Sequence, residues 1–546
     1  MSKKFFIALS LIVCGLLFAS EIEFTKLDTL YILQTTDIHG NIFAYDYFLD
    51  EPAQRGLAKI HTRIKEYRRK YETVLVDCGD MIQGTPLTYY YNRIDTVSAH
   101  PMIEAMNIME YDAFTVGNHE IEQGTDVYNR CRNQSDFPWL SANSTLENDS
   151  TYFQPYIIIE RNNLKIGILG LTTPAIPMWL DDSLYPGIKW QDMIETASKY
   201  VKILRPQVDI LIGTFHSGFD ETDGAEKTKL MGLPTDNASG LVAIQVPGFD
   251  LIFGGHSHNE LPMKKSISVD ENSPLQLISG SWGRKLGVAE IITASNADSS
   301  WIIQKSVWLE DIKEIQPSDE FADLQSIYHQ PVLDYIRKEI GTSKDTLSSA
   351  KSRLQDSALM QLINQAQLDF TDADISFAAC FNTNVNIEPG PIKVKDIYKL
   401  YPYENYLYVV SMTGQQIKDF LEYSSRYYYW ENGKLQTNQN IKGYNFDMAE
   451  GISYSIDYTK KSGDRIGNIL LSDSASRLDL NKKYKVAMNS YRASGGGGHL
   501  PAAGAQENEV LFKSNLEMRN ILAEYIMKIG FIENIVDSNW KIIIPQ

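Results

Sequence analysis

The segment Tyr111-Asp112-Ala113-Phe114-Thr115-Val116-Gly117-Asn118-His119-Glu120 joins an apolar, β-branched run to a polar end. The run predicts a strand, and Asn118 and His119 follow it in a loop. Loops at strand ends of α/β sheets are common places for binding and catalytic residues. Because Gly-Asn is also ordinary turn chemistry, this segment alone leaves a simple turn as an equal alternative.

Four similar polar clusters follow other strand-like runs. They are Asp37-Ile38-His39-Gly40-Asn41, Asp77-Cys78-Gly79-Asp80, His216-Ser217-Gly218 and Gly254-Gly255-His256-Ser257-His258. Asp carboxylates, neutral His nitrogens and an Asn carbonyl oxygen suit hard or borderline divalent cations. The candidate ligands are Asp37, His39, Asp80, Asn118, His216, His256 and His258. They are too many for one ion, whereas two ions sharing a carboxylate would use them all, and paired metals suit phosphoryl transfer.

Length and charge limit the possible functions. A chain of 546 residues with 43% hydrophobic composition can form more than one core, so two domains are expected. The net charge of -18 argues against a nucleic-acid polymer as partner, because no basic face is available for its phosphates. A single nucleotide stays compatible, since a local metal centre can outweigh the overall field.

The N-terminus has the pattern of a secretory signal peptide, residues 1–20. Ser2-Lys3-Lys4 precedes an apolar stretch, residues 5–19, that is too short for a transmembrane span. We therefore expect an exported protein, periplasmic or at the cell surface, with lipid anchoring at Cys14 as the minor alternative. The other cysteines are Cys78, Cys131 and Cys380. Their wide spacing predicts free buried thiols, although export would permit one disulfide.

Hydrophobic periodicity predicts two α/β domains. Expected strands in the first half are residues 30–34, 74–76, 165–171, 209–214 and 250–253, and expected helices are 56–70 and 101–109. Alternating helices and strands favour a layered domain with a mixed sheet. A charged helical stretch, residues 319–340, marks the boundary. Beyond it we expect helices at 350–368 and 413–426, strands at 375–379 and 484–490, and a flexible loop at 495–498.

The five clusters, in this order and spacing, resemble the calcineurin-like metallophosphoesterase superfamily. The resemblance is to its secreted 5'-nucleotidase and 2',3'-cyclic-nucleotide 2'-phosphodiesterase branch, and it covers nearly the whole mature chain. It implies a four-layer αββα metallophosphoesterase domain at residues 25–315, followed by a linker helix at 316–341. A second α/β domain, the 5'-nucleotidase C-terminal substrate-binding domain, is implied at residues 342–546.

The resemblance also implies roles for the candidate ligands. One divalent ion is expected on Asp37, His39 and His258, a second on Asn118, His216 and His256, and Asp80 is expected to bridge them. Zn, Mn, Co and Mg are all candidates. His119 would stabilise charge on the phosphate or protonate the leaving oxygen. The family places an Asp three residues after this His to orient it, and here Glu122 takes that place, with an exposed loop acid as the alternative.

The C-terminal domain is implied to hold a nucleobase between two aromatic rings. Tyr491 is the first expected ring, and Phe446 is the better-aligned second, with Tyr444 as the fallback. Core packing is the alternative, because the chain has 31 tyrosines. Residues 379–384 lack the glycines and the Arg of many 5'-nucleotidases, which leaves Arg353 as the candidate basic contact.

Residues 100–107, 444–447 and 489–493 look closer to the 2',3'-cyclic-nucleotide 2'-phosphodiesterase/3'-nucleotidase subgroup. The leading hypothesis is therefore an exported phosphohydrolase with two metals, for which 2',3'-cyclic and 3'-nucleotides are favoured over 5'-nucleotides and UDP-sugars. The alternatives are a catalytically silent nucleotide-binding protein and an oligosaccharide-processing factor related to the superfamily's sulfate-releasing enzymes. The expected partner is a small nucleotide, the oligomeric state stays open, and a domain rotation is implied about residues 319–340.

Overall fold

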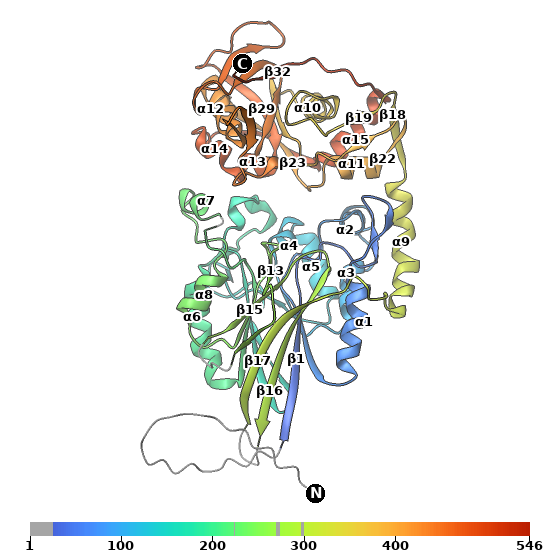
Figure 1. Cartoon of the computed structure of the whole chain (residues 1–546), viewed down its shortest axis with the longest axis vertical. Helices are drawn as coiled ribbons and strands as arrows, with labels where there is room; N and C mark the ends of the chain where they lie inside the picture. The colour runs from blue at the N-terminus through green and yellow to red at the C-terminus, as the bar shows by residue number, and fades with distance from the viewer. Residues whose placement is uncertain (1–25, 223, 269–272, 296–299, 546) are drawn as a thin grey trace.

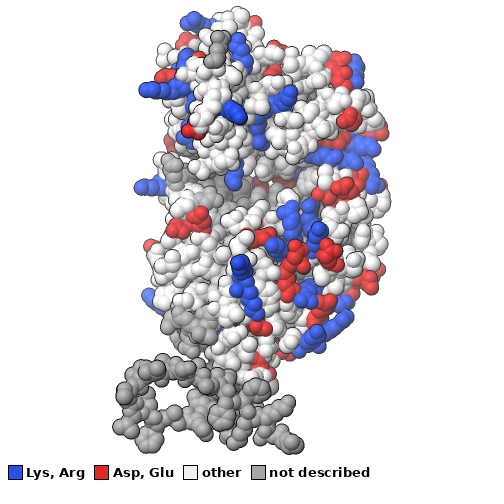
Figure 2. Space-filling model, viewed as in Figure 1, with Lys and Arg blue, Asp and Glu red and all other residues white. Residues whose placement is uncertain are grey.

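The computed structural model describes residues 26–222, 224–268, 273–295 and 300–545, which form two domains linked by helix α9 (Ala322–Ile336) (Figure 1). The predicted signal peptide and Cys14 lie outside the described residues. Within the described ranges, no helix has both the length and the apolar character needed to cross a membrane. On the face drawn in Figure 2, acidic and basic side chains are interspersed, without a continuous basic surface.

Two sheets form the centre of the N-terminal domain. The first has the order β14 (Ser266–Ser268), β17 (Ser300–Asp311), β16 (Lys285–Ser295), β1 (Lys26–Thr35), β4 (Glu72–Asp77), β5 (Ala113–Thr115), β6 (Trp139–Leu140). The second has the order β13 (Glu260–Leu261), β15 (Leu275–Ser279), β12 (Leu251–Phe253), β11 (Ile210–His216), β9 (Leu164–Thr172), β8 (Tyr156–Arg161). Strands β1, β4 and β5 are parallel, as are β9, β11 and β12, so their carboxyl ends lie at the same edge of each sheet.

Helices cover the outer face of each sheet, which confirms the expected αββα layers. The apolar side chains between the sheets come from both, for example Ile32 and Val76 from the first and Ile212 from the second. Helices α1 (Leu57–Arg68), α3 (Pro101–Ile108) and α5 (Thr125–Gln134) share a core with the first sheet. Helices α6 (Met193–Leu204) and α8 (Ser239–Gln245) pack on the second sheet.

The C-terminal domain has its own core around a five-stranded sheet, and Tyr89 of the N-terminal domain packs into it. Its strand order is β26 (Asp447–Glu450), β20 (Ile375–Ala379), β29 (Lys483–Asn489), β23 (Tyr406–Thr413), β30 (Val510–Glu517). Helices α10 (Ala358–Phe370), α11 (Val394–Leu400), α12 (Gly414–Ser424) and α15 (Met518–Ile529) contribute side chains to this core. The rings of Phe377 and Phe420 stack in it at a centroid distance of 4.2 Å.

Two predictions for this domain are wrong in detail. The helix expected from residue 350 begins at Ala358, because the Ser357 side chain accepts a hydrogen bond from the backbone N–H of Met360 and so caps the first turn. The glycine run is a buried 3₁₀ turn and not a flexible loop, with Gly497 and Gly498 at φ of 75° and 78°. Left-handed backbone of this kind favours glycine.

Helix α9 belongs to the N-terminal domain by its packing. Leu324, Tyr328 and Val332 are buried in the core under the first sheet, and the Tyr328 hydroxyl donates to Glu104 at 2.6 Å. The helix ends at Ile336, and strand β18 (Glu339–Ser343) starts the C-terminal domain. Only residues 337 and 338 separate the two elements, so most of the stretch expected to act as a hinge is packed helix.

Candidate metal centre and substrate cleft

Strand ends bring the seven predicted ligands together. Asp37 and His39 follow β1, Asp80 follows β4 and Asn118 follows β5. His216 ends β11, and His256 and His258 follow β12. Because the parallel strands of each sheet end at one edge and the two sheets pack face to face, five loops distant in sequence converge there.

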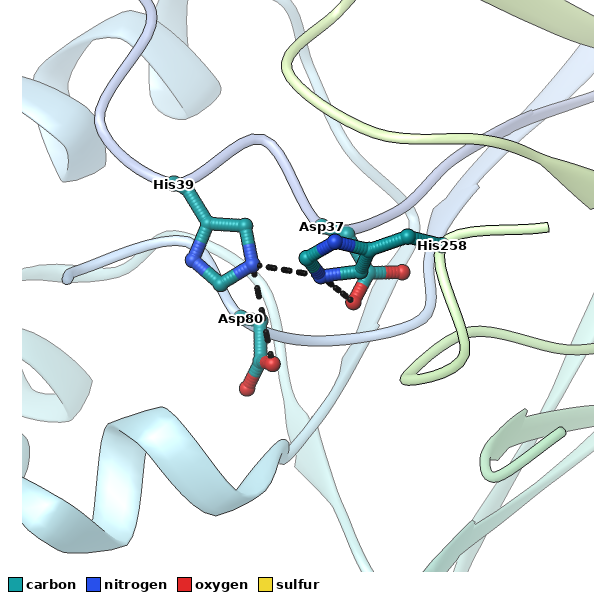
Figure 3. Close-up of side chains that lie close together, drawn as sticks. All are labelled: Asp37, His39, Asp80 and His258. Carbon is teal, nitrogen blue, oxygen red and sulfur yellow. Dashed lines mark hydrogen bonds and ion pairs between the residues drawn. The ribbon is translucent and has the colours of Figure 1, made fainter. Parts of the chain in front are cut away.

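One group of ligands consists of Asp37, His39, Asp80 and His258 (Figure 3). The Nε2 atoms of His39 and His258 are 2.9 Å apart. His258 Nε2 lies 3.4 Å from Asp37 Oδ1, and His39 Nε2 lies 3.9 Å from Asp80 Oδ2. A cation requires several atoms whose lone pairs are directed towards one common point. Hydrogen-bond donors cannot serve this purpose.

The second group shares Asp80 with the first. His216 Nε2 lies 3.2 Å from Asp80 Oδ2 and 3.0 Å from Asn118 Oδ1. His256 Nδ1 is 2.9 Å from the same Asn118 oxygen. The seven side chains thus fall into two sets around one carboxylate. Imidazole, carboxylate and amide oxygen donors fit two divalent ions such as Zn, Mn, Co or Mg.

Hydrogen bonds to the opposite ring nitrogens orient three of the imidazoles. His216 Nδ1 is 2.6 Å from the carbonyl oxygen of Cys78, and His39 Nδ1 is 3.2 Å from that of Gln83. His256 Nε2 is 3.3 Å from Asp236 Oδ1. A ring nitrogen that donates to such an acceptor leaves the other nitrogen unprotonated for a metal.

The backbone at the ligands is strained. Asp37, His39, Asp80, His256 and His258 have φ values of 51°, 48°, 63°, 69° and 56°, which are uncommon for residues other than glycine. Such conformations are kept where the surroundings impose them, and they concentrate at functional sites. Gly117 allows the close approach of two loops, since a Cβ there would lie 2.2 Å from Asp80 Oδ1.

Proton affinities reflect the density of acids and imidazoles. Burial favours a raised pKa for Asp80, but His216 and His119 nearby hold this pKa well below its ordinary value. Burial lowers the pKa of His39 to about 4 against the opposing charge of Asp80. Burial alone would lower the pKa of His216, but Asp80 and Asp37 raise it to about 9. Divalent cations would replace protons as the counter-charge for these carboxylates.

His119 and Glu122 form the expected pair. The two residues lie on α4 (Asn118–Glu122), and His119 Nδ1 is 2.5 Å from Glu122 Oε2. The backbone N–H of His119 donates to Asp80 Oδ1 at 2.9 Å. Burial lowers the pKa of His119, whereas the charges of Asp80 and Glu122 raise it to about 10. The His119 ring therefore lies beside the candidate metal ligands with a carboxylate at its Nδ1.

Two supporting acids were not predicted from the sequence. The fully buried Glu120 carboxylate accepts backbone N–H groups of Gly117 and Asp80, both at 2.8 Å, and of Met81 at 2.7 Å. Asp236 accepts from the Thr173 hydroxyl at 2.5 Å and faces His256. Glu120 belongs to the Gly117-Asn118-His119-Glu120 segment and could have been predicted from it. No local sequence pattern identifies Asp236.

A cleft of about 320 Å³ opens between the domains beside these residues. The hollow at the domain boundary is visible on the face drawn in Figure 2. Its N-terminal wall includes Asn118, His119, Glu122, Trp179, Asp181 and His256. Its C-terminal wall includes Phe381, Tyr403, Glu404, Tyr406, Tyr444 and Tyr491. The candidate metal ligands thus lie at one side of a cleft whose other side is largely aromatic.

The structure corrects two of the predicted substrate contacts. Phe446 has no exposed surface and packs in the core against Tyr427 and Trp540, so it is not available to a nucleobase. The fallback, Tyr444, lines the cleft because it sits on the 3₁₀ turn η7 (Gly443–Asn445) before the chain enters β26. Arg353 does not line the cleft, since its guanidinium donates to the carbonyl oxygen of Cys380 at 2.6 Å.

Tyr491 lines the cleft as predicted, and further aromatic residues join it there. Tyr403 lies 6.3 Å from Tyr444 and 5.0 Å from Phe381 between ring centroids. On the opposite wall, the Trp179 ring is 5.3 Å from that of His256. No spacing in the sequence singled out Phe381, Tyr403 or Trp179, because they come from separate loops.

Two family profiles match the chain. The calcineurin-like phosphoesterase profile matches residues 30–260, and the profile of the 5'-nucleotidase C-terminal domain matches residues 339–504. The family assignment of both domains agrees with the expected resemblance.

Curated relatives agree with this assignment, and a solved structure shares the fold. The trifunctional nucleotide phosphoesterase protein YfkN of Bacillus subtilis is 30% identical over 94% of this chain, which spans only 39% of that protein. A 2',3'-cyclic-nucleotide 2'-phosphodiesterase/3'-nucleotidase of Yersinia enterocolitica is 28% identical over 94% of this chain and 88% of its own length. The crystal structure of a putative 5'-nucleotidase from Staphylococcus aureus covers 95% of this chain and all of its own, with a TM-score of 0.80 at 21% identity, and so shares the fold.

Proposed function

The chain belongs to the calcineurin-like phosphoesterases that carry a 5'-nucleotidase C-terminal domain, and from this premise we propose that it hydrolyses nucleotide phosphoesters with two divalent metal ions. The observation that carries the proposal is the position of the two ligand groups, which share Asp80 and lie beside a cleft lined by tyrosines of the other domain.

The proposed metal sites follow the two ligand groups. Asp37, His39 and His258 would hold one ion, Asn118, His216 and His256 would hold the second, and Asp80 would be shared by the two sites. When bound, two such ions polarise a phosphoryl group and lower the pKa of water.

The reacting groups of the chain itself are His119 and Glu122. Glu122 holds the Nδ1 proton of His119, at an Nδ1 to Oε2 distance of 2.5 Å, and so fixes the orientation of the ring. In the proposed reaction a water oxygen bonds to phosphorus as the bond from phosphorus to the leaving oxygen breaks. The Nε2 proton of His119 goes to that leaving oxygen, and the proton lost by the water passes to solvent, from which His119 is reprotonated. Before the transfer the positive ring opposes the charge that develops on the phosphate.

The C-terminal domain selects the substrate in this proposal. Tyr491 and Tyr444 are the rings that stack on a nucleobase, and such contacts contribute about 1–3 kcal/mol per base. Nucleoside 2',3'-cyclic phosphates and 3'-phosphates are the favoured substrates, which agrees with the name of the Yersinia relative and its match over 88% of its length. We propose an exported location, periplasmic or at the cell surface, on the basis of residues 1–20.

The test is hydrolysis of a substrate panel by metal-stripped protein to which Mn, Zn, Co or Mg is restored. The panel contains 2',3'-cyclic AMP, 3'-AMP, 5'-AMP and UDP-glucose, with phosphate release and chromatographic product analysis as readouts. We expect turnover that depends on metal. It is expected to be lost in His119→Ala and kept in His329→Ala, which replaces a half-buried histidine on α9. Nucleotide binding without turnover under any metal would contradict the proposal and identify a silent binding protein.

A further inference from the structure

Helix α4 carries His119 and Glu122, and its C-terminal end contacts the other domain. The helix has only five residues, so its own hydrogen bonds fix its position poorly. Its first turn is held within the N-terminal domain, where Glu120 accepts backbone N–H groups and the His119 N–H donates to Asp80. The orientation of its last turn therefore depends on what holds Gln123, the residue that follows the helix.

Gln123 is 4% exposed, and both ends of its side-chain amide are bonded. Its Nε2 donates to Glu404 Oε2 of the C-terminal domain at 3.1 Å, and its Oε1 accepts from Asn92 Nδ2 at 3.0 Å. Its carbonyl oxygen accepts from Arg93 Nη1 at 3.2 Å. The end of α4 is thus held by one acid of the other domain and by two residues of η1 (Tyr90–Ile94).

Glu404 is itself held firmly within the C-terminal domain. It precedes β23 and is 5% exposed, and Arg519 Nη2 lies 3.0 Å from its Oε1. The same Arg519 atom donates to Glu517 Oε2 at 3.2 Å, and Glu517 Oε1 accepts from Arg93 Nε at 3.4 Å. The Arg519 guanidinium lies over the Tyr398 ring, 4.4 Å from its centroid. Because these buried charges are paired with one another, Glu404 offers Gln123 an acceptor in a fixed place.

We propose that Gln123 and Glu404 are positioning residues for His119, an inference that rests on the proposed function. The C-terminal domain thus takes part in the reaction as well as in substrate binding, because its Glu404 fixes the helix that carries the proposed proton donor. His119 Nδ1 is 2.5 Å from Glu122 on the last turn of α4, so a shift of that turn moves the ring. Proton transfer to a leaving oxygen depends steeply on such placement.

The first test compares wild type with Gln123→Ala on two substrates that differ only in the leaving atom. They are the best substrate of the nucleotide panel and its analogue in which sulfur replaces the leaving oxygen, both with Mn-loaded protein. Gln123 is not among the described residues that line the cleft, so we expect KM to change little and kcat for the oxygen substrate to fall about tenfold. A thiolate leaves without a proton, so kcat for the sulfur analogue is expected to stay within about twofold. An equal fall for both substrates, or no fall for either, would overturn the inference.

Variants of the partner show whether the two residues act through one contact. Glu404→Ala is expected to lower kcat for the oxygen substrate as Gln123→Ala does, and Glu404→Ala/Gln123→Ala is expected to lower it no further. Losses that multiply in the double variant would mean that the residues act separately, which contradicts the proposed contact.

The matched control is another hydrogen bond between the domains. Asn520→Ala removes the contact in which the Tyr89 hydroxyl donates to Asn520 Oδ1 at 2.9 Å, and this contact involves neither α4 nor Gln123. Asn520→Ala is expected to keep the wild-type kcat. A loss equal to that in Gln123→Ala would mean that any weakening of the interface slows the reaction, and would contradict a specific role of Gln123 and Glu404.

A second readout does not need turnover. Backbone hydrogen exchange followed by mass spectrometry measures how firmly residues 117–124 are held. We expect faster exchange in this segment in Gln123→Ala and Glu404→Ala, and the wild-type rate in Asn520→Ala. A wild-type protein that hydrolyses no nucleotide would remove the proposed function, and faster exchange in both variants would still show that Glu404 positions the helix. Wild-type turnover with unchanged exchange and kcat in both variants would keep the enzyme function and overturn this inference.

Discussion

The contact between Glu122 and His119 controls proton transfer in the proposed reaction. We expect Glu122→Gln to lower the pKa of His119, because the Glu122 charge is one of the causes that raise it to about 10. An acid must stay protonated, so kcat falls as pH rises through this pKa, and the alkaline limb of the kcat profile moves to lower pH in the variant. Bound metal ions would offset the negative charge of Asp80, which also raises the pKa of His119. The alkaline limbs of the wild type and of Glu122→Gln are therefore both expected below pH 10.

The measurement is the pH profile of kcat for the wild type, Glu122→Gln and Glu122→Asp. The Asp variant keeps the charge and serves as the control for side-chain length. A limb that stays in place in Glu122→Gln, or moves to higher pH, would show that Glu122 does not tune the proton donor. For His119→Ala we expect kcat to fall by about a hundredfold or more.

Glu120 contributes to stability at the same site. Its carboxylate accepts four backbone N–H groups from two loops, so Glu120→Ala leaves several buried donors unsatisfied. We expect the free energy of unfolding of the N-terminal domain to fall by about 3 kcal/mol or more. Urea denaturation followed by tryptophan fluorescence measures it. The control is Glu122→Ala, and a loss in Glu120→Ala no larger than in that variant would contradict the structural role.

At this scale the sequence predicted which candidate ligands come together in the fold, but only part of what surrounds them. Asp37 and His258 could be recognised because each follows a strand in a short polar cluster, which is a local signal. Asp236 could not, since its function depends on a contact with His256 that only the folded chain creates. The sequence could not decide between Phe446 and Tyr444, because the decision depends on the turn η7. Tyr444 on this turn lines the cleft, whereas Phe446, two residues later, is buried in the core.

Among the elements, α9 determines how the two domains are joined. Its apolar spacing predicted a helix, but the sequence did not show that the helix packs on the N-terminal domain. The spacing of apolar residues identifies the face of a helix that is buried, but not the element against which that face packs. At its end, Arg337 forms an ion pair with Asp50 at 2.8 Å, and Lys395 of α11 contacts the same carboxylate at 2.8 Å. Asp50 lies in the hairpin of β2 (Tyr45–Asp46) and β3 (Glu51–Pro52) of the N-terminal domain. Its ion pairs thus join this domain to the residue after α9 and to the C-terminal domain.

We expect Asp50→Asn to weaken this fastening in a pH-dependent way. Burial raises the pKa of Asp50, but Arg337 and Lys395 outweigh it and hold this pKa well below its ordinary value. A carboxyl with a depressed folded pKa stabilises above its unfolded pKa of about 3.9 and loses that contribution as pH falls through the folded value. Because Arg337 is 44% exposed and the pair is screened, the effect at neutral pH is about 1 kcal/mol.

Thermal unfolding of Asp50→Asn and wild type across pH checks this expectation. The difference between the two proteins is expected to be largest at neutral pH and to shrink towards strongly acidic pH. Glu51→Gln changes the neighbouring exposed acid and is the control. A difference that is constant with pH would mean that the substitution acts through packing and not through the ion pairs.

For the whole molecule, the sequence predicted two domains and could not place one against the other. The cleft depends on contacts such as Gln123 Nε2 to Glu404 Oε2 at 3.1 Å and Tyr89 hydroxyl to Asn520 at 2.9 Å, which join residues far apart in the chain. No local pattern marks such pairs. The aromatic wall of the cleft therefore became visible only with the domains in place.

The location of the ligands predicts how metal affects unfolding of the whole chain. All seven lie in the N-terminal domain, whose cores meet the core of the C-terminal domain only through a few interface residues such as Tyr89. An ion that binds only the folded state stabilises it by about 2.7 kcal/mol at a hundredfold excess over Kd, which raises Tm of a domain of this size by about 4–5 °C. Calorimetry of Mn-loaded and chelator-treated protein is expected to show two transitions, of which the N-terminal one shifts with metal. Asp80→Asn, which lacks the shared carboxylate, is expected to lose most of that shift. Equal shifts of both transitions would mean that metal binding is coupled to the C-terminal domain through the interface.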